Sequence, residues 1–303
     1  MDRTGNKIIS ASRRTDIPGW YTPWFLEQVR LGFFTIKNPY NKVEKRVDVL
    51  PENIHSIVFW SKNFGPFLDL SADRILSDMG YHLYFNATVN SRNTLLEPGL
   101  PALSERLGQV KLLCERFGPD KISWRFDPLC FYRTDNGHLE NNLGDFTLIA
   151  DAMAGMGITR CVSSFYDDYQ KILTRARYLS LQGNPLVTFV DPEKKDRQKI
   201  VRRMADYLET KNIALYLCCE TALISDPGAK TCIRPNACID GRQLKGLYGG
   251  DPEIQRDYGQ RSKQGCRCTR SVDIGTYEDH PCFHNCLFCY ANTGTDTQLR
   301  QRH

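Results

Sequence analysis

Three cysteines near the end of the 303-residue chain have the type and spacing of metal ligands. The stretch HPCFHNCLFCYAN, residues 280–292, holds Cys282, Cys286 and Cys289 in the pattern C-x-x-x-C-x-x-C. A structural zinc site takes four ligands, so three thiolates are one short of that set. They suit a cubane iron–sulfur cluster better, because each can bind one corner iron and leave a fourth iron without a protein ligand. An open metal position is typical of a catalytic site.

The chain has 12 cysteines, and a second group of them precedes this motif. Clustered cysteines in a reducing compartment more often bind metal than form disulfides. We predict a second thiolate site from Cys219, Cys238, Cys266 and Cys268. It would hold an auxiliary iron–sulfur cluster or a structural zinc ion, with unliganded thiols as a third alternative and Cys218 and Cys232 as spares. Cys114, Cys130 and Cys161 are scattered among apolar neighbours and are expected to be buried as small hydrophobic residues.

The elements that must position these residues follow a regular pattern of strands and helices. Short apolar runs, as a parallel sheet requires, predict strands at 7–12, 56–63, 81–90, 121–128, 160–167 and 212–220. Helical spacing lies between them, at 22–31, 101–118, 143–157 and 192–212. Thr22 would cap the first helix, with Pro23 in its first turn, and Gly118 would end the second. Residues 32–50 predict a hairpin turning near 38–41. The fold class is therefore α/β, with a full or partial β/α barrel.

Polar residues stand at the predicted strand ends, where such barrels place their working groups. They are Arg13, Arg14, Asp16, Ser61, Lys62, Asn63, Asn86, Thr88, Asn90, Arg125, Asp127, Ser163, Ser164, Tyr166 and Glu220. We expect them to line a polar cavity. Lys62 would pair with Asp16 or Asp127, or donate a proton if buried. Arg125 would pair with Asp127 or hold a ligand carboxylate. His284, inside the motif, is an alternative metal ligand, but a position at the surface of the motif loop is expected.

Two regions follow from the composition. Residues 1–220 form the β/α barrel, and residues 221–303 form an irregular Cys-rich segment that carries the terminal motif. This segment has too little apolar content to order itself, so packing on the barrel or metal ligation must order it.

Overall composition restricts the protein's surroundings without naming a partner. Net charge is +5, which permits an anionic partner such as nucleic acid but does not require one. No apolar run reaches the roughly 20 residues of a membrane span, and MDRTGNKIIS lacks the apolar core of a secretion signal. A cytoplasmic protein without a membrane partner is expected.

The terminal motif resembles the radical S-adenosylmethionine superfamily signature, C-x-x-x-C-x-aromatic-C, with Phe288 as the aromatic residue. The resemblance implies that the three motif cysteines hold a [4Fe-4S] cluster whose fourth iron chelates S-adenosylmethionine. One electron, from a flavodoxin- or ferredoxin-type donor, would cleave it to methionine and a 5′-deoxyadenosyl radical that abstracts hydrogen from a substrate. Phe288 and Tyr290 would wall the cluster and the adenine side. Arg13 and Arg125 are the candidates for the carboxylate.

The chain departs from this superfamily in two respects. The superfamily motif follows the first barrel strand, whereas here it comes at the end. Circular permutation accounts for this if residues 271–277, SVDIGTY, form the strand before the cluster loop and pair beside the first strand. No Gly-Gly-Glu segment follows the neighbouring strand, so the contacts to the methionine amine stay unassigned.

The whole chain also resembles a bacterial family known as domain of unknown function 1848, a resemblance that implies no particular reaction. The matching stretches are ISASRRTDIP, FWSKN, WRFDP, ACIDG and CLFCYA.

The leading hypothesis is a radical S-adenosylmethionine enzyme that acts on an unknown substrate. The alternative is a metal-stabilised binding module, with zinc or an iron–sulfur cluster, for nucleic acid or another anionic ligand. A third hypothesis is an electron-transfer protein, which would not need the polar strand ends. A binding module needs a complete ligand set, whereas the motif supplies only three thiolates.

Overall fold

An eight-stranded parallel sheet forms the centre of the computed structural model, which describes residues 7–37, 43–225 and 233–291. Its strands, in spatial order, are β12 (Ile233–Pro235), β11 (Ala214–Leu217), β9 (Arg160–Ser163), β6 (Ile122–Arg125), β5 (Leu83–Thr88), β4 (Ile54–Ser61), β1 (Lys7–Ala11) and β13 (Val272–Asp273). Each predicted apolar run matches one of these strands. Within the described residues no pairing joins β12 to β13. The sheet is therefore barrel-like but open, so of the two expected forms, a full or a partial barrel, the full barrel is not formed.

Alternate residues of the central strands face two different layers. Ile9, Ile57 and Phe85 belong to the main core beneath the helices. Their neighbours Ile8 and Val58 belong to a smaller core that includes Leu244. Because successive side chains on a strand point to opposite faces, both faces of the sheet must be apolar here. This is why the strands are continuous apolar runs rather than alternating ones.

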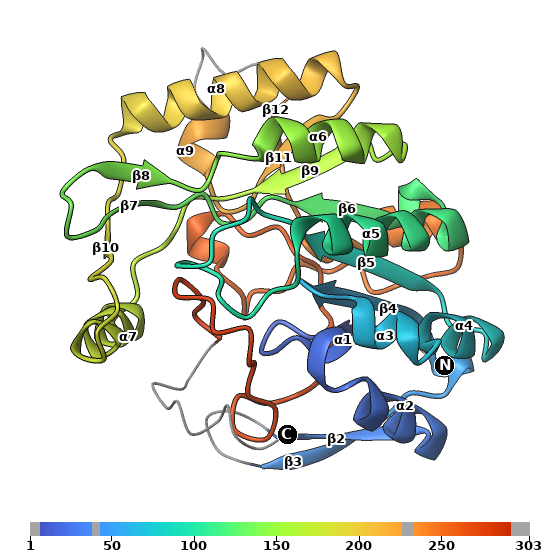
Figure 1. Ribbon diagram of the computed structural model, residues 1–303. Coiled ribbons are helices and arrows are strands. Elements are labelled where there is room, and N and C mark those ends of the chain that lie inside the picture. Colours follow the sequence, from blue (N-terminus) through green and yellow to red (C-terminus); the bar gives the residue numbers. More distant parts are fainter. Residues whose placement is uncertain (1–6, 38–42, 226–232, 292–303) are drawn as a thin grey trace.

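Helices cover one face of the sheet in chain order, as Figure 1 shows from α3 through α5 and α6 to α8. The helices are α1 (Ile17–Trp20), α2 (Thr22–Leu31), α3 (Gly65–Asp69), α4 (Ala72–Asp78), α5 (Leu103–Phe117), α6 (Phe146–Gly155), α7 (Gln170–Leu181), α8 (Lys194–Thr210), α9 (Thr221–Ile224) and α10 (Gly241–Tyr248), with single 3₁₀ turns at Pro51–Asn53, Pro119–Lys121 and Ser262–Gln264. No helix in the described ranges combines the length and the apolar character needed to cross a membrane.

Two helix ends test the sequence-based expectations. Gly118 follows α5 with φ +88°, a conformation that glycine adopts without strain, so the predicted end of this helix is confirmed. The predicted Thr22 cap is wrong. α2 begins at Thr22, its cap position is Tyr21, and the Thr22 hydroxyl donates to the carbonyl of Pro18 at 3.0 Å. The hydroxyl is engaged there because α1 comes directly before α2.

Two small antiparallel sheets flank the main one. β2 (Phe33–Lys37) pairs with β3 (Glu44–Asp48), which confirms the hairpin. The predicted turn near 38–41 lies outside the described residues. β7 (Phe131–Arg133) pairs with β8 (Leu139–Asn141) and with β10 (Thr188–Phe189). This second sheet was not predicted, because strands of two or three residues are too short to give a periodic signal.

The segment from residue 221 contributes both edge strands of the main sheet, β12 and β13. β13 pairs in parallel with β1 in the register Ile9↔Val272 and Ser10↔Asp273, as expected for residues 271–277. The same segment supplies α10, which packs on the sheet face opposite the main helix layer. The Gln243 side chain there donates to the Tyr84 hydroxyl at 2.9 Å.

Candidate functional site

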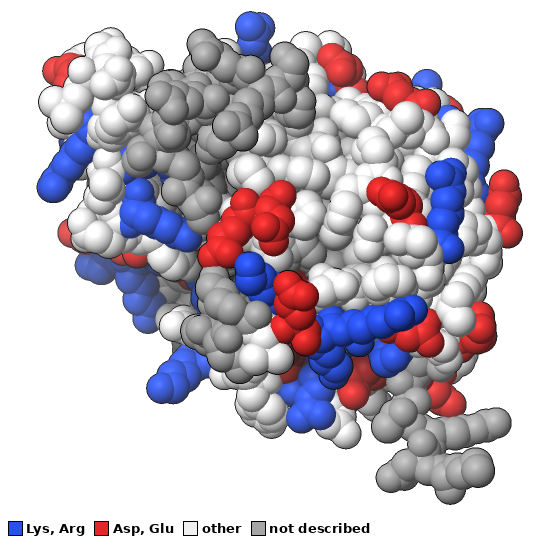
Figure 2. Space-filling model, turned by 90° about the horizontal axis from the view of Figure 1, so that it is seen from below, with Lys and Arg blue, Asp and Glu red and all other residues white. Residues whose placement is uncertain are grey.

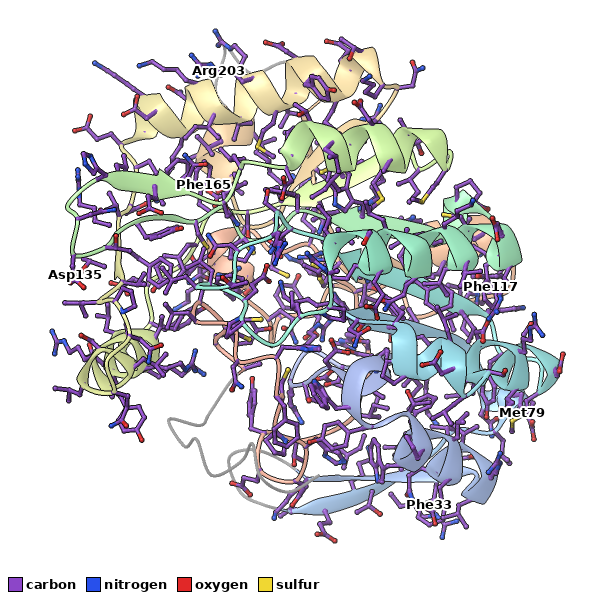
Figure 3. All side chains as sticks on the ribbon, in the orientation of Figure 1. Phe33, Met79, Phe117, Asp135, Phe165 and Arg203 are labelled. Carbon is purple, nitrogen blue, oxygen red and sulfur yellow. The ribbon has the colours of Figure 1, made fainter. Side chains whose placement is uncertain are left out.

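A cavity of about 440 Å³ lies where the parallel strands end. The predicted strand-end residues that line it are Arg13, Asp16, Ser61, Lys62, Thr88, Arg125, Asp127, Ser164 and Tyr166. Arg14, Asn63, Asn86, Asn90, Ser163 and Glu220 are not in its lining. Phe165, labelled in Figure 3, is buried and lines the cavity. Arg203, also labelled there, points outward from α8. The carboxyl ends of the strands therefore border a cavity, and nine of the fifteen polar residues predicted to line it do so.

Both predicted groups of cysteines border this cavity. Its sulfur-bearing residues are Cys218, Cys219, Cys238, Cys266, Cys268, Cys282, Cys286 and Cys289. Cys232 lies outside the described residues. Cys114, Cys130 and Cys161 are buried and are absent from the cavity lining, as expected for small hydrophobic residues.

The terminal motif reaches the cavity because β13 lies beside β1. Asp273, the last residue of β13, accepts hydrogen bonds from the Ser10 hydroxyl at 2.5 Å and from the Arg13 backbone at 2.9 Å. Its second oxygen lies 3.3 Å from Nε of Arg14. The Arg14 side chain is thus held on Asp273 and is not part of the cavity lining, and these contacts fix the start of the motif loop against the end of β1.

The motif loop is held mainly through its backbone. Arg175 of α7 donates to the carbonyl groups of Cys286, Leu287 and Cys289 at 3.3, 2.9 and 3.1 Å. The Leu287 amide donates to the carbonyl of Leu96 at 2.8 Å. The thiol groups are thereby left to face the cavity.

Gly99 allows a second close approach to this loop. Its amide donates to the His284 carbonyl at 3.1 Å. A Cβ atom at Gly99 would lie 2.7 Å from the same oxygen, which is closer than real Cβ contacts come. Only glycine fits this position without a shift of the loop.

The structure shows no preformed metal site at the three motif thiols. In the part of the chain that the structure describes, no group of three or more His, Cys, Asp or Glu side chains is gathered as around one metal ion. Burial raises the pKa of the Cys282 and Cys286 thiols, and nearby Asp16 adds to the rise at Cys282. Positively charged irons would favour the thiolate forms.

His284 is not at the surface, contrary to the prediction. It is buried, and its Nε2 lies 2.8 Å from Oδ2 of Asp16. The same Asp16 oxygen accepts from the Lys62 amide at 3.0 Å. The local sequence around His284 does not indicate a carboxylate partner, because Asp16 comes close to it only in the folded chain.

Contrary to the prediction, the Lys62 side chain pairs with neither Asp16 nor Asp127. Its Nζ lies 2.5 Å from Oε1 of Glu97, a buried carboxylate that the sequence analysis missed. The Cys286 thiol donates to the same oxygen at 3.9 Å. Glu97 lies in a loop without periodicity, so no pattern could have identified it.

The four predicted cofactor-binding residues all line the cavity but divide into two places. The Tyr290 hydroxyl donates to the Arg13 carbonyl at 3.1 Å, and Lys62 Nζ lies 5.1 Å from the centre of the buried Phe288 ring. Arg125 instead pairs with Asp127 at 2.6 Å, which confirms one of its two expected roles. Arg125 also donates to the Cys238 sulfur, so it lies with the second cysteine group.

Comparisons with known proteins place the chain in one family and give little else. A family model described as "Domain of unknown function (DUF1848)" matches residues 8–291. No curated protein matches the chain. Among solved structures, 16 chains match, and one is morphinone reductase, with 12% identity, a TM-score of 0.29 and coverage of 84% of this chain. The chain spans 63% of the length of that protein.

Proposed function

The chain belongs to the DUF1848 family, and we propose that it is a radical S-adenosylmethionine enzyme with a circularly permuted, partial β/α barrel. The observation that carries the proposal is that Cys282, Cys286 and Cys289 face one cavity from the loop after β13. Because β13 lies beside β1, that loop stands at the carboxyl end of a parallel sheet. This is where β/α folds place their chemistry.

The proposed cofactors are a [4Fe-4S] cluster on the three motif thiols and S-adenosylmethionine. When bound, the cluster would supply one electron to cleave the sulfonium compound to a 5′-deoxyadenosyl radical. The donor set fits, because three thiolates from one loop leave one iron of a cubane without a protein ligand. The substrate and a flavodoxin- or ferredoxin-type electron donor complete the proposed partners.

The chain's own residues would bind, shield and orient. Phe288 and Phe165 give the cavity apolar walls, which exclude water from a reactive species. Arg13 and Lys62 place positive charge on the same cavity, where it would attract a carboxylate. The Tyr290 hydroxyl donates to the Arg13 backbone carbonyl, which fixes the aromatic ring at the end of β1.

The binding-module alternative stays a prediction with weaker support. A nucleic-acid surface concentrates lysine and arginine on one face. On the face in Figure 2, basic and acidic side chains are interspersed instead.

The test is formation of 5′-deoxyadenosine. Anaerobically reconstituted protein, incubated with S-adenosylmethionine and dithionite, should release 5′-deoxyadenosine and methionine. The Cys286→Ala variant should fall to the background level, because the cluster loses one of its three ligands. Cys114→Ala is the matched control, since Cys114 is a free, buried cysteine away from the cavity. A fully loaded protein that forms no 5′-deoxyadenosine would contradict the assignment.

A further inference from the structure

Five thiols outside the terminal motif meet on the cavity wall, and all five are free rather than joined in disulfides. This five-cysteine group consists of Cys218, Cys219, Cys238, Cys266 and Cys268. The first two follow β11, Cys238 follows β12, and the last two lie in the loop before β13. Three segments that are far apart in sequence thus deliver thiols to one place.

Cys218 belongs to this group and is not a spare thiol. Its sulfur lies 3.7 Å from the sulfur of Cys238 and 3.9 Å from that of Cys219. Cys218 is predicted from the sequence to be a spare, with no local signal for a place in the group. Cys219, however, has φ +62°, a left-handed conformation that is unusual for a residue with a side chain. The strand has ended there, so both sulfurs can reach the group.

Nitrogen donors surround the sulfur of Cys238 and its neighbour. The Asn236 side chain and Nη1 of Arg125 each lie 3.3 Å from the Cys238 sulfur. The Cys238 amide donates to the Cys268 sulfur at 3.2 Å. Such donors stabilise negative charge on sulfur and are the contacts that tune iron–sulfur centres. A neutral packing role for these cysteines would not require a buried guanidinium against one of them.

The sulfur–sulfur distances suit a metal centre but do not by themselves select the metal. A single zinc ion holds four sulfurs that are all about 3.8 Å apart, given Zn–S bonds of about 2.3 Å. The sulfur of Cys218 lies at 3.7 and 3.9 Å from two of its neighbours, close to that spacing. The nitrogen donors on the Cys238 and Cys268 sulfurs are what favours an iron–sulfur cluster, because such contacts tune these centres.

We propose that the five-cysteine group holds a second iron–sulfur cluster, bound through four of its thiols, on the same cavity as the terminal motif. A substrate in this cavity would therefore contact two iron–sulfur centres. The inference depends only on these five residues and their donors. It stands whether or not the terminal motif cleaves S-adenosylmethionine.

The experiment uses a full-length variant without the terminal thiols, Cys282→Ala/Cys286→Ala/Cys289→Ala. After anaerobic reconstitution with ferrous iron and sulfide, it should retain about four irons and four sulfides per chain, half of the wild-type content. Adding Cys238→Ala and Cys268→Ala should remove this remainder. Cys114→Ala, placed in the triple variant, is the control and should leave it unchanged.

Two results would overturn the inference. One is a triple variant that holds zinc without acid-labile sulfide, or no metal at all. The other is fully reconstituted wild-type protein with only about four irons per chain, which decides the matter even if the variants are insoluble. Failure of the 5′-deoxyadenosine assay affects neither readout, so the two proposals can fail separately.

Discussion

Nε2 of His284 lies 2.8 Å from Oδ2 of Asp16, although 268 positions separate the two residues in the sequence. The contact joins the middle of the terminal motif to the turn after β1. Both side chains are buried, so no solvent competes for the hydrogen bond. Asp16 also accepts from the Gly19 amide at 2.8 Å, which fixes the carboxylate before His284 meets it.

His284→Ala and Asp16→Asn should each weaken iron retention at the terminal motif. Partners that orient a metal-bearing loop typically contribute about 10- to 100-fold in metal affinity. The measurement is iron loss to a chelator over time, compared with His138→Ala, an exposed histidine. Equal loss from all three variants would show that the Asp16–His284 contact does not position the loop.

Gly99→Ala should destabilise the protein by about 1–3 kcal/mol, the usual cost of inserting a methyl group into a packed position. The added Cβ would lie 2.7 Å from the His284 carbonyl oxygen, so the loop must shift. Gly108→Ala is the control. Gly108 lies in α5 with no atom within 4 Å of its Cβ position, and this variant should gain about 0.5–1 kcal/mol from helix propensity. Urea denaturation measures both, and destabilisation by Gly108→Ala but not Gly99→Ala would contradict the expectation.

Lys62→Met should cost about 3–5 kcal/mol, because it leaves the Glu97 carboxylate buried without its cation. The double variant Lys62→Met/Glu97→Leu should recover part of this loss. The free energy of unfolding from urea denaturation gives both values. A double variant that is less stable than Lys62→Met would contradict the role of the pair.

The same pair predicts a pH dependence. Burial lowers the pKa of Lys62, but the Glu97 carboxylate together with Cys286 and Cys289 raises the pKa above its ordinary value. The stabilisation is therefore fully present below the unfolded-state pKa of about 10.4 and is lost as the pH rises through the folded-state pKa. The stability difference between wild type and Lys62→Met should stay constant from about pH 7 to about pH 9 and shrink only near pH 11. A difference that shrinks already below pH 9 is the contrary outcome.

Arg175→Lys should loosen the motif loop while keeping the positive charge. All three contacts come from Nη1, and the lysine ammonium ends one bond short of that atom, so it cannot reach the three carbonyl groups in the same way. We expect several-fold faster release of iron from the terminal motif. Arg177→Lys, an exposed position on the same helix, is the matched control. If the Arg175→Lys variant releases iron at the wild-type rate, the other contacts of the motif loop are sufficient to hold it in place.

The strands and the cavity could be predicted from the sequence because both follow from local patterns. Continuous apolar runs gave the six central strands, and polar residues after them marked the cavity. The position of β13 beside β1 was also expected, since the motif needed a strand before it.

The partners of buried charges could not be predicted, because they meet only in the folded chain. Glu97 carries no local signal, yet it neutralises Lys62. His284 was expected at the surface and is buried against Asp16. Cys218 was set aside, although the left-handed turn at Cys219 brings its sulfur into the five-cysteine group.

The pairing of β13 with β1 also affects how the chain reaches its folded state on the ribosome. β1 emerges early, but the strand that completes its edge arrives more than 250 residues later. Until then its free N–H and C=O groups form an open template for another chain. Contacts between such distant segments also slow folding. Fragments that end before Val272 should therefore aggregate, and a chaperone that covers exposed strands should raise the yield of the intact protein.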